Sequence, residues 1–272
     1  MARVVSPVPI EEEYRERSRL YGTAVRSYRD PALLLLMLED LRLAEGLSVL
    51  DLGAGQGDAS LPLWRGGAQV MAVDISREML ETGGERGGLE PGKWVVCDLR
   101  KESLPFADST FDVALTRFVI HDLSDLNLLF KEVHRVLRPQ GLFQVVDMSL
   151  PTGAGISLYN AIHSRKALSG RLPCWIRDVP SLRRSLDKHH FSVVREHWYS
   201  SQVESTDWLS EGQIDDEGHR NLVAYVTGAI SKRPRPAMAL GLSVGDGRFS
   251  ARFPVVVLTS RNGGMVSELG GD

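Results

Sequence analysis

Alternating glycines follow a short apolar segment and an acid early in the chain. Residues 49–57 read VLDLGAGQG, so Asp51 precedes Gly53, Gly55 and Gly57. Glycine has no Cβ and tolerates positive φ, so such a turn can bring backbone N–H groups close to a nucleoside or a carboxylate. The acid at the end of the apolar segment could meet a cationic group of the same ligand. The pattern predicts a strand that ends in a site for a nucleotide-like ligand.

The spacing of these glycines distinguishes between cofactor classes. Dinucleotide sites use G-x-G-x-x-G, whereas this chain has G-x-G-x-G and carries Asp58 where the third glycine of that pattern would fall. A second apolar segment, 69–74, ends in Asp74 about 20 residues after the first glycine, where an acid can accept bonds from both ribose hydroxyls. These residues alone leave open a nicotinamide or flavin site, a structural glycine turn, and a role for Asp74 as a helix cap.

Several further strings follow in a characteristic order. The glycine string resembles the first motif of class I S-adenosylmethionine (SAM)-dependent methyltransferases, and VDISREML at 73–80 looks like their second motif. The apolar segment 94–97 before Asp98, the segment 111–118, VIHDL at 119–123 and PQG at 139–141 resemble later landmarks of this family. The chain departs from the family pattern at Asp122, where a second histidine is common, and at Gln140, where glycine is customary. The resemblance covers residues 49–147.

The resemblance implies an α/β fold with SAM as cofactor and S-adenosylhomocysteine (SAH) as product. The expected fold is a Rossmann-like, seven-stranded, mostly parallel sheet with helices on both faces, an N-terminal helical lid and a cap insertion after the fifth strand. The implied reaction is direct in-line methyl transfer to an O, N or C atom of a small organic metabolite. The residues assigned to cofactor binding are Asp51, Gly53, Gly55, Gly57, Asp74, Ile75, Met79, Asp98, Leu99, Arg117 and, from the lid, Tyr21.

A histidine follows the predicted fourth strand and is the candidate catalytic residue. A hydroxyl acceptor needs a base that takes its proton, and His121 lies just beyond residues 111–118. The alternative is a histidine packed at a helix start, and His163 is a weaker second candidate. We expect His121 to act as the base and no metal to take part.

The segments around the motifs define an expected organisation. We predict a helical lid at 1–44, a SAM-binding core at 45–150, a cap insertion and helix at 151–190, and strands and a helix that complete the sheet at 191–272. The resemblance places the last strand, 248–261, antiparallel between the fifth, 142–147, and the sixth, 191–199. Helices are expected at 32–43 and 179–189, and the segment 207–230 is expected to be mainly helical.

Composition limits the class of partner. The chain has 272 residues, 43% of them hydrophobic, and a net charge of −3, which gives no general case for nucleic acid or a membrane surface as partner. Cys97 and Cys174 are its only cysteines, so neither a disulfide framework nor a zinc cluster is expected, and we predict a cytoplasmic enzyme. Two alternatives keep the SAM site without methyl transfer: a cyclisation or rearrangement catalyst, and a silent SAM-binding partner subunit. The sequence leaves the oligomeric state undetermined.

Overall fold

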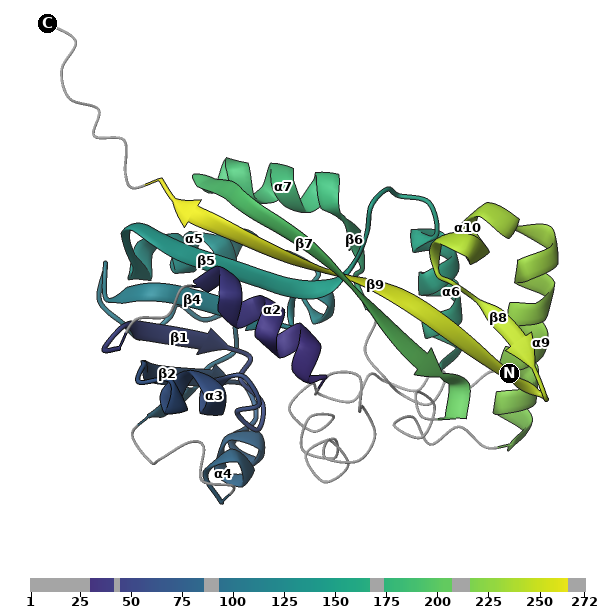
Figure 1. The fold of residues 1–272 in the computed structure, drawn as a ribbon, viewed down its shortest axis with the longest axis horizontal. Coiled ribbons are helices and arrows are strands. Elements are labelled where there is room, and N and C mark those ends of the chain that lie inside the picture. The colour runs from purple at the N-terminus through teal and green to yellow at the C-terminus, as the bar shows by residue number, and fades with distance from the viewer. Residues whose placement is uncertain (1–29, 42–44, 86–92, 167–173, 207–215, 264–272) are drawn as a thin grey trace, which may run out of the picture.

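The protein is described by a computed structural model that covers residues 30–41, 45–85, 93–166, 174–206 and 216–263. Within these residues the chain forms one twisted sheet with helices on both faces (Figure 1). The predicted residue Tyr21 and most of the predicted lid lie outside the described residues. No helix among the described residues is long and apolar enough to cross a membrane.

Nine strands form the sheet in the described part of the chain, two more than predicted. The main order is β3-β2-β1-β4-β5-β9-β7, and two short strands, β6 and β8, pair with β5 and β9. Strands β1 to β5 are parallel, whereas β9 runs antiparallel between β5 and β7, as predicted for the last strand. The strand bounds are β1 Ser48–Leu52, β2 Gln69–Asp74, β3 Trp94–Val96, β4 Phe111–Arg117, β5 Leu137–Leu150, β6 Arg177–Asp178, β7 Phe191–Glu204, β8 Ser243–Gly245 and β9 Arg248–Asn262.

Helices cover both faces because successive side chains of each strand point to opposite sides. In β4, Val113 and Leu115 pack in a cluster with α2, while Ala114 packs in a second cluster with α5 and α7. Figure 1 shows α2 in front of the strands. The helix bounds are α2 Pro31–Leu41, α3 Ser60–Arg65, α4 Arg77–Glu85, α5 Asn127–Val136, α6 Ile156–Lys166, α7 Val179–Lys188, α9 Asp216–Lys232 and α10 Pro234–Ala239, with a short 3-10 helix, η2, at Ile120–Asp122.

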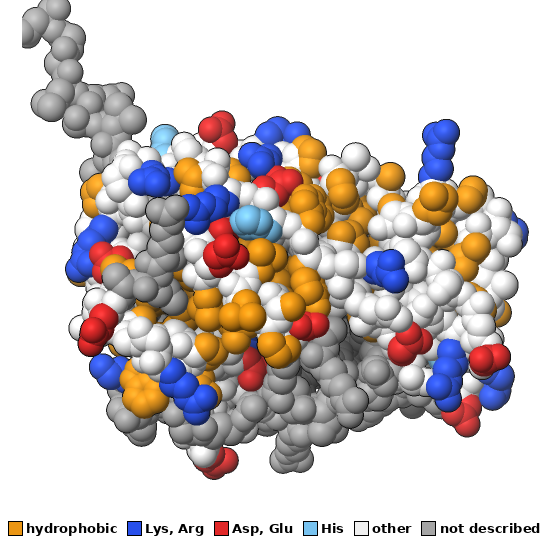
Figure 2. Space-filling model, in the orientation of Figure 1, with side chains coloured by type: hydrophobic (Ala, Val, Ile, Leu, Met, Phe, Trp, Pro, Cys, Tyr) orange, Lys and Arg blue, Asp and Glu red, His pale blue; other side chains and the backbone are white. Residues whose placement is uncertain are grey.

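Helix α2 is the described part of the segment predicted to be a lid. Its residues Leu33 and Met37 are buried in the core, and its Asp40 accepts hydrogen bonds from Thr259 and pairs with His197 at 2.9 Å each. The outer side of the same helix presents Leu35, which is 67% exposed. Figure 2, in the orientation of Figure 1, shows hydrophobic side chains gathered on the face where α2 lies. Helix α2 is thus a fixed part of the core, and the lid itself remains a prediction.

The β4 to β5 connection shows how the chain accommodates its departure from the family pattern. Strand β5 begins at Leu137, earlier than the predicted start at residue 142. Within it, Gln140 adopts a φ of 66°, the left-handed conformation that glycine adopts most easily. The residue at the customary glycine position therefore takes a glycine-like conformation, where the register of β5 against β4 shifts between Leu137 and Leu142.

Candidate active site

The glycine turn after β1 has the conformation that its sequence predicts. Gly53, Gly55 and Gly57 have φ values of 72°, 56° and 79°. A Cβ at Gly53 would lie 2.2 Å from Val119 Cγ2, a distance at which side chains overlap. Val119 belongs to the loop after β4, so this loop packs directly on the glycine turn. Only glycine fits at residue 53, because Val119 already occupies the space that a side chain would need.

Asp74, at the end of β2, holds this turn in place. Its Oδ2 accepts a hydrogen bond from the Gly55 N–H at 2.8 Å, and its Oδ1 accepts one from the Ser76 N–H at 2.9 Å. Burial raises the pKa of Asp74, although these backbone hydrogen bonds oppose the shift. Ser76 in turn accepts a bond from the Met79 N–H at 3.2 Å, as expected of a helix N-cap. Asp74 thus braces the loop, and its oxygens retain lone pairs for further donors.

Asp51 is buried at the end of β1 beside the turn. Ser60 donates a hydrogen bond to its Oδ2 at 2.6 Å. Burial raises its pKa to about 6; the Ser60 hydrogen bond and the charge of Arg117 oppose this shift, whereas Asp74 and Asp58 add to it. A cation bound next to Asp51 would reverse much of this cost, because it would stabilise the charged carboxylate.

Arg117, at the end of β4, faces this group of acids. Its guanidinium lies 3.8 Å from Asp58 and above the ring of Phe118, 5.9 Å from the ring centre. Asp51 and Asp58 both interact with this guanidinium, and Asp51 also feels the charge of Asp74, so three carboxyl groups lie near one cation. With all three ionised, the excess of negative charge suits a ligand with net positive charge.

Asp98 lies beyond β3, next to the site, because the Cys97 N–H donates to the Asp74 carbonyl at 2.9 Å. Arg100 donates to both oxygens of Asp98, at 2.8 and 2.7 Å, and Lys101 lies 3.3 Å away. Burial alone would raise the pKa of Asp98, but these bonds together lower it. The assignment of Asp98 to the adenine amine remains a prediction. In that role, a carboxylate that already has two cationic partners would have to accept a further hydrogen bond.

The other predicted cofactor contacts differ in exposure. Met79 and Leu99 are buried, whereas Ile75 is half-buried. Their contact with a cofactor also remains a prediction.

His121 lies in η2, after β4, and pairs with an acid of the neighbouring strand. Its Nδ1 is 2.6 Å from Oδ1 of Asp147, and its backbone N–H donates to Oδ2 of Asp147 at 3.2 Å. Asp147 is buried on β5 and also accepts the Met148 N–H at 2.7 Å. A carboxylate at this distance favours the tautomer with the proton on Nδ1, which makes Nε2 the basic nitrogen. His121 and Asp147 form the arrangement of a general base and the group that orients it.

The backbone around His121 is held by residues that follow α6 along the chain. The Trp175 N–H donates to the His121 carbonyl at 2.6 Å. Arg177 donates to the carbonyls of Ile120 at 2.8 Å and Leu123 at 2.6 Å, so its guanidinium bridges both ends of η2. Burial lowers the pKa of Arg177, although the charge of Asp147 opposes this. The loop that carries His121 is therefore fixed from outside, and Trp175 leaves 43% of its surface exposed beside it.

Two residues of this site were not singled out from the sequence. In the sequence, Asp147 was recognised only as the last residue of the fifth strand. The available signal was that an acid ends the strand next to the one that His121 follows. Arg177 had no comparable signal, because its contacts depend on how the segment after α6 folds back. The weaker candidate His163 lies on α6 and stacks on Tyr159, with 5.8 Å between ring centres.

Comparisons with known proteins concern the family and the fold. A family model for a methyltransferase domain matches residues 50–145. The chain is 30% identical to a demethylmenaquinone methyltransferase of Clavibacter sepedonicus over 71% of this chain and 75% of that protein. It is 29% identical to an uncharacterized methyltransferase of Synechocystis sp. over 61% of this chain and 76% of that protein.

A solved structure of similar fold is that of the YcgJ protein from Bacillus subtilis. It superposes with a TM-score of 0.72 at 20% identity and covers 85% of this chain and 98% of its own. Among the first curated relatives that it matches, the chain spans between 34% and 76% of their length. No group of three His, Cys, Asp or Glu side chains that could hold a metal ion occurs among the described residues.

Proposed function

Because the chain belongs to the class I SAM-dependent methyltransferases, we propose that it methylates a small organic acceptor with His121 as general base. SAM, when bound, supplies a methyl group that is already activated on a sulfonium. The protein must then align the acceptor, exclude water and take up the proton that the acceptor loses. The observation that carries the proposal is the 2.6 Å contact between His121 and Asp147.

The residues around the glycine turn fit SAM. The positive φ values of Gly53, Gly55 and Gly57 form a tight turn whose backbone a ligand can approach, and the excess of carboxylates complements a cofactor with a sulfonium and an ammonium group. We assign Asp51 to the ammonium group and Asp74 to the ribose hydroxyls. The spare lone pairs of Asp74 support the second assignment, because its bonds to Gly55 and Ser76 use only part of its accepting capacity.

His121 would act on the acceptor side of the glycine turn. Val119, which packs against Gly53, lies two residues before His121, so the base and the cofactor turn are neighbours. Asp147 keeps the proton on Nδ1 and stabilises the imidazolium that forms when Nε2 takes a proton. Such a base contributes about 10² to 10⁴ in rate, which matters most for an acceptor that loses a proton. We therefore favour a hydroxyl group as the acceptor.

The surroundings of His121 support a small acceptor with an apolar part. Trp175 presents an exposed indole next to the loop that carries His121. A relative of this chain is a demethylmenaquinone methyltransferase, which supports a small organic molecule over a macromolecule.

The test compares variants of the base and its partner on a panel of hydroxyl-bearing acceptors. With labelled SAM, His121→Ala is expected to lower kcat about 100-fold or more while SAM affinity stays within about twofold of the parent protein. Asp147→Asn should lower kcat at least about tenfold and alter its pH profile, because the tautomer and the basicity of His121 both depend on the carboxylate. His163→Ala is the matched control, since it removes a histidine outside this pair and is expected to leave kcat unchanged.

The outcomes separate the proposal from its alternatives. Unchanged kcat in His121→Ala, or a loss of SAM affinity, would reject the base. Conversion of an acceptor without formation of SAH would instead identify a catalyst that uses bound SAM for a cyclisation or rearrangement.

A further inference from the structure

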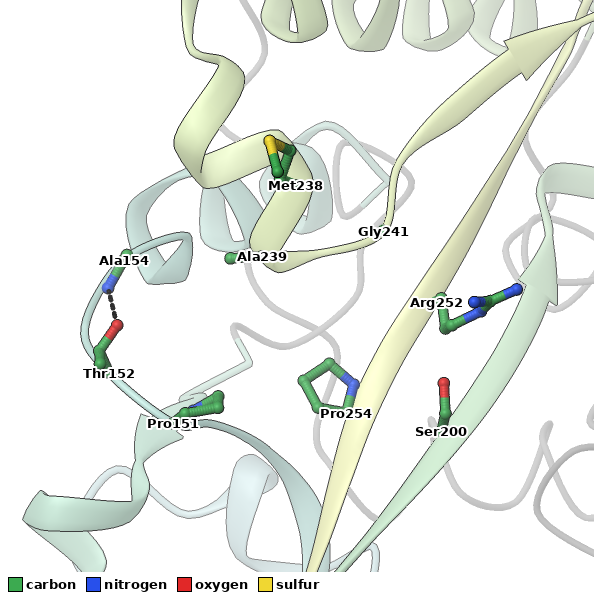
Figure 3. Close-up of a pocket in the computed structure, with 9 residues that line it drawn as sticks. All are labelled: Pro151, Thr152, Ala154, Ser200, Met238, Ala239, Gly241, Arg252 and Pro254. Atoms are coloured by element: carbon green, nitrogen blue, oxygen red, sulfur yellow. Dashed lines mark hydrogen bonds between the residues drawn. The ribbon is translucent and has the colours of Figure 1, made fainter.

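A pocket of about 400 Å³ lies between α10, the loop after β5 and the adjacent strands β7 and β9 (Figure 3). This volume is within the range of small-ligand sites. Its lining residue next to β5, Pro151, comes directly after that strand and follows Asp147 by four residues, which corresponds to about 13 Å along an extended chain. The pocket is therefore separate from His121 and its partner.

The walls of this pocket are apolar, and its polar groups are hydrogen-bond donors. Pro151 and Pro254 form rigid walls that lack backbone N–H groups, and Met238 lies above them in Figure 3. Arg252 and Ser200 project from neighbouring strands on the other side. They are diagonal neighbours, because Ser200 pairs with Pro254, two residues after Arg252. In Figure 3 the Ser200 hydroxyl points toward the Arg252 side chain, and the guanidinium of Arg252 extends away from Pro254.

The lining of the pocket contains one cation and no acid. Within the described part of the chain, no side-chain hydrogen bond or ion pair of Arg252 is found. Glu204 on β7 is an acid that does not line the pocket. It accepts a hydrogen bond from Gln202 at 3.3 Å. Thr152, on the far side, accepts the Ala154 N–H at 3.3 Å and keeps its own proton to donate. The pocket thus offers one positive charge and two hydroxyl donors.

These features identify the class of ligand. One guanidinium balances the single charge of a carboxylate and presents two parallel donors to its two oxygens. A phosphate monoester carries nearly two charges at neutral pH and would leave part of this charge uncompensated. We propose that this pocket binds small organic carboxylates with an apolar body, as a second ligand site distinct from the methyl-transfer site.

Calorimetric titration of the full-length protein with octanoate tests this proposal, with octanamide and octyl phosphate as comparison probes. Octanoate is expected to bind, and to bind more tightly than the uncharged amide or the more highly charged phosphate. Arg252→Ala should weaken octanoate binding about fivefold, equivalent to ~1 kcal/mol, because the pair is exposed to solvent. Arg248→Ala is the matched control, since it removes an exposed cation of the same strand that does not line the pocket.

Two further readouts keep the result decisive. Unchanged SAM affinity in Arg252→Ala would show that the variant is folded, and saturating SAM should leave octanoate affinity unchanged. Equal binding of octanoate and octanamide, tighter binding of octyl phosphate, or equal octanoate affinity in Arg252→Ala and the parent protein would overturn the proposal. Competition between SAM and octanoate would overturn it as well, because the carboxylate would then lie in the methyl-transfer site.

Discussion

Lowering the pH from 7 to 5 is expected to weaken SAM binding about tenfold through one carboxyl group, Asp51. This side chain is 1% exposed, and burial raises its pKa to about 6 in the ligand-free protein. If the ammonium group of SAM binds beside it, the charged form is stabilised and the pKa returns toward its ordinary value of 3.8. SAM then binds the deprotonated form, and protons compete with it below pH 6.

The magnitude follows from the two pKa values. At pH 5 about one-tenth of the free protein has a charged Asp51, whereas at pH 7 about nine-tenths has. In the complex the group is charged at both pH values. Binding at pH 5 must therefore expel nearly one proton and is weaker by about 1.4 kcal/mol, or about tenfold. The ammonium group of the ligand stays protonated across this range, so the change is assigned to the protein.

Isothermal titration calorimetry at pH 5, 6 and 7, in buffers of different ionisation enthalpy, measures both the affinity and the number of protons released. The Asp51→Asn variant is the control. It should bind SAM more weakly at pH 7 and should lose the dependence of affinity on pH.

Equal SAM affinity at pH 5 and 7, without proton release, would refute this reasoning. A tenfold dependence that persists in Asp51→Asn would also refute it. Such a result would assign the titration to another buried acid, for which Asp74 is the nearest candidate because burial raises its pKa too.

Three substitutions test other parts of the site. Gly53→Ala should lower the free energy of unfolding by about 2 to 5 kcal/mol in urea denaturation, because the new Cβ meets Val119 and the φ of 72° disfavours alanine; a change below ~1 kcal/mol would contradict this. Asp74→Ala should weaken SAM binding by about 1.5 to 3 kcal/mol if its carboxylate accepts the ribose hydroxyls, and calorimetry that shows unchanged affinity would exclude that role. Arg177→Met should leave SAM affinity unchanged but lower kcat, because the carbonyls of η2 lose the donor that positions His121; unchanged kcat would show that η2 holds its shape without it.

The parts of the fold that the sequence predicts correctly are those set by local patterns. The glycine turn and Asp74 follow from strand ends and turn chemistry that a few adjacent residues determine. The position of β9 between β5 and β7 came from the family resemblance, since residues far apart in the chain decide it. The short strands β6 and β8 were missed because they are only two and three residues long.

The side-chain partners in the site were harder to predict than the strands. The pairing of His121 with Asp147 depends on the register of β4 and β5 and on the path of η2, neither of which the sequence pattern specifies. Asp98 shows the opposite case: Arg100 and Lys101, only two and three residues away, bind the carboxylate that was assigned to the adenine amine. Motif positions identify which residues lie near a ligand, whereas the contacts of each residue depend on its neighbours in space.

The central claim concerns where SAM and the base lie relative to one another, and a crystal structure of the complex with SAH tests it most directly. We expect the ribose hydroxyls within hydrogen-bond distance of Asp74, the ammonium group beside Asp51, and the sulfur within about 8 Å of His121 Nε2, a span that accommodates a methyl group and an acceptor atom. A ribose bound away from Asp74, or a His121 ring that lies outside this distance or faces away from the sulfur, would contradict the account.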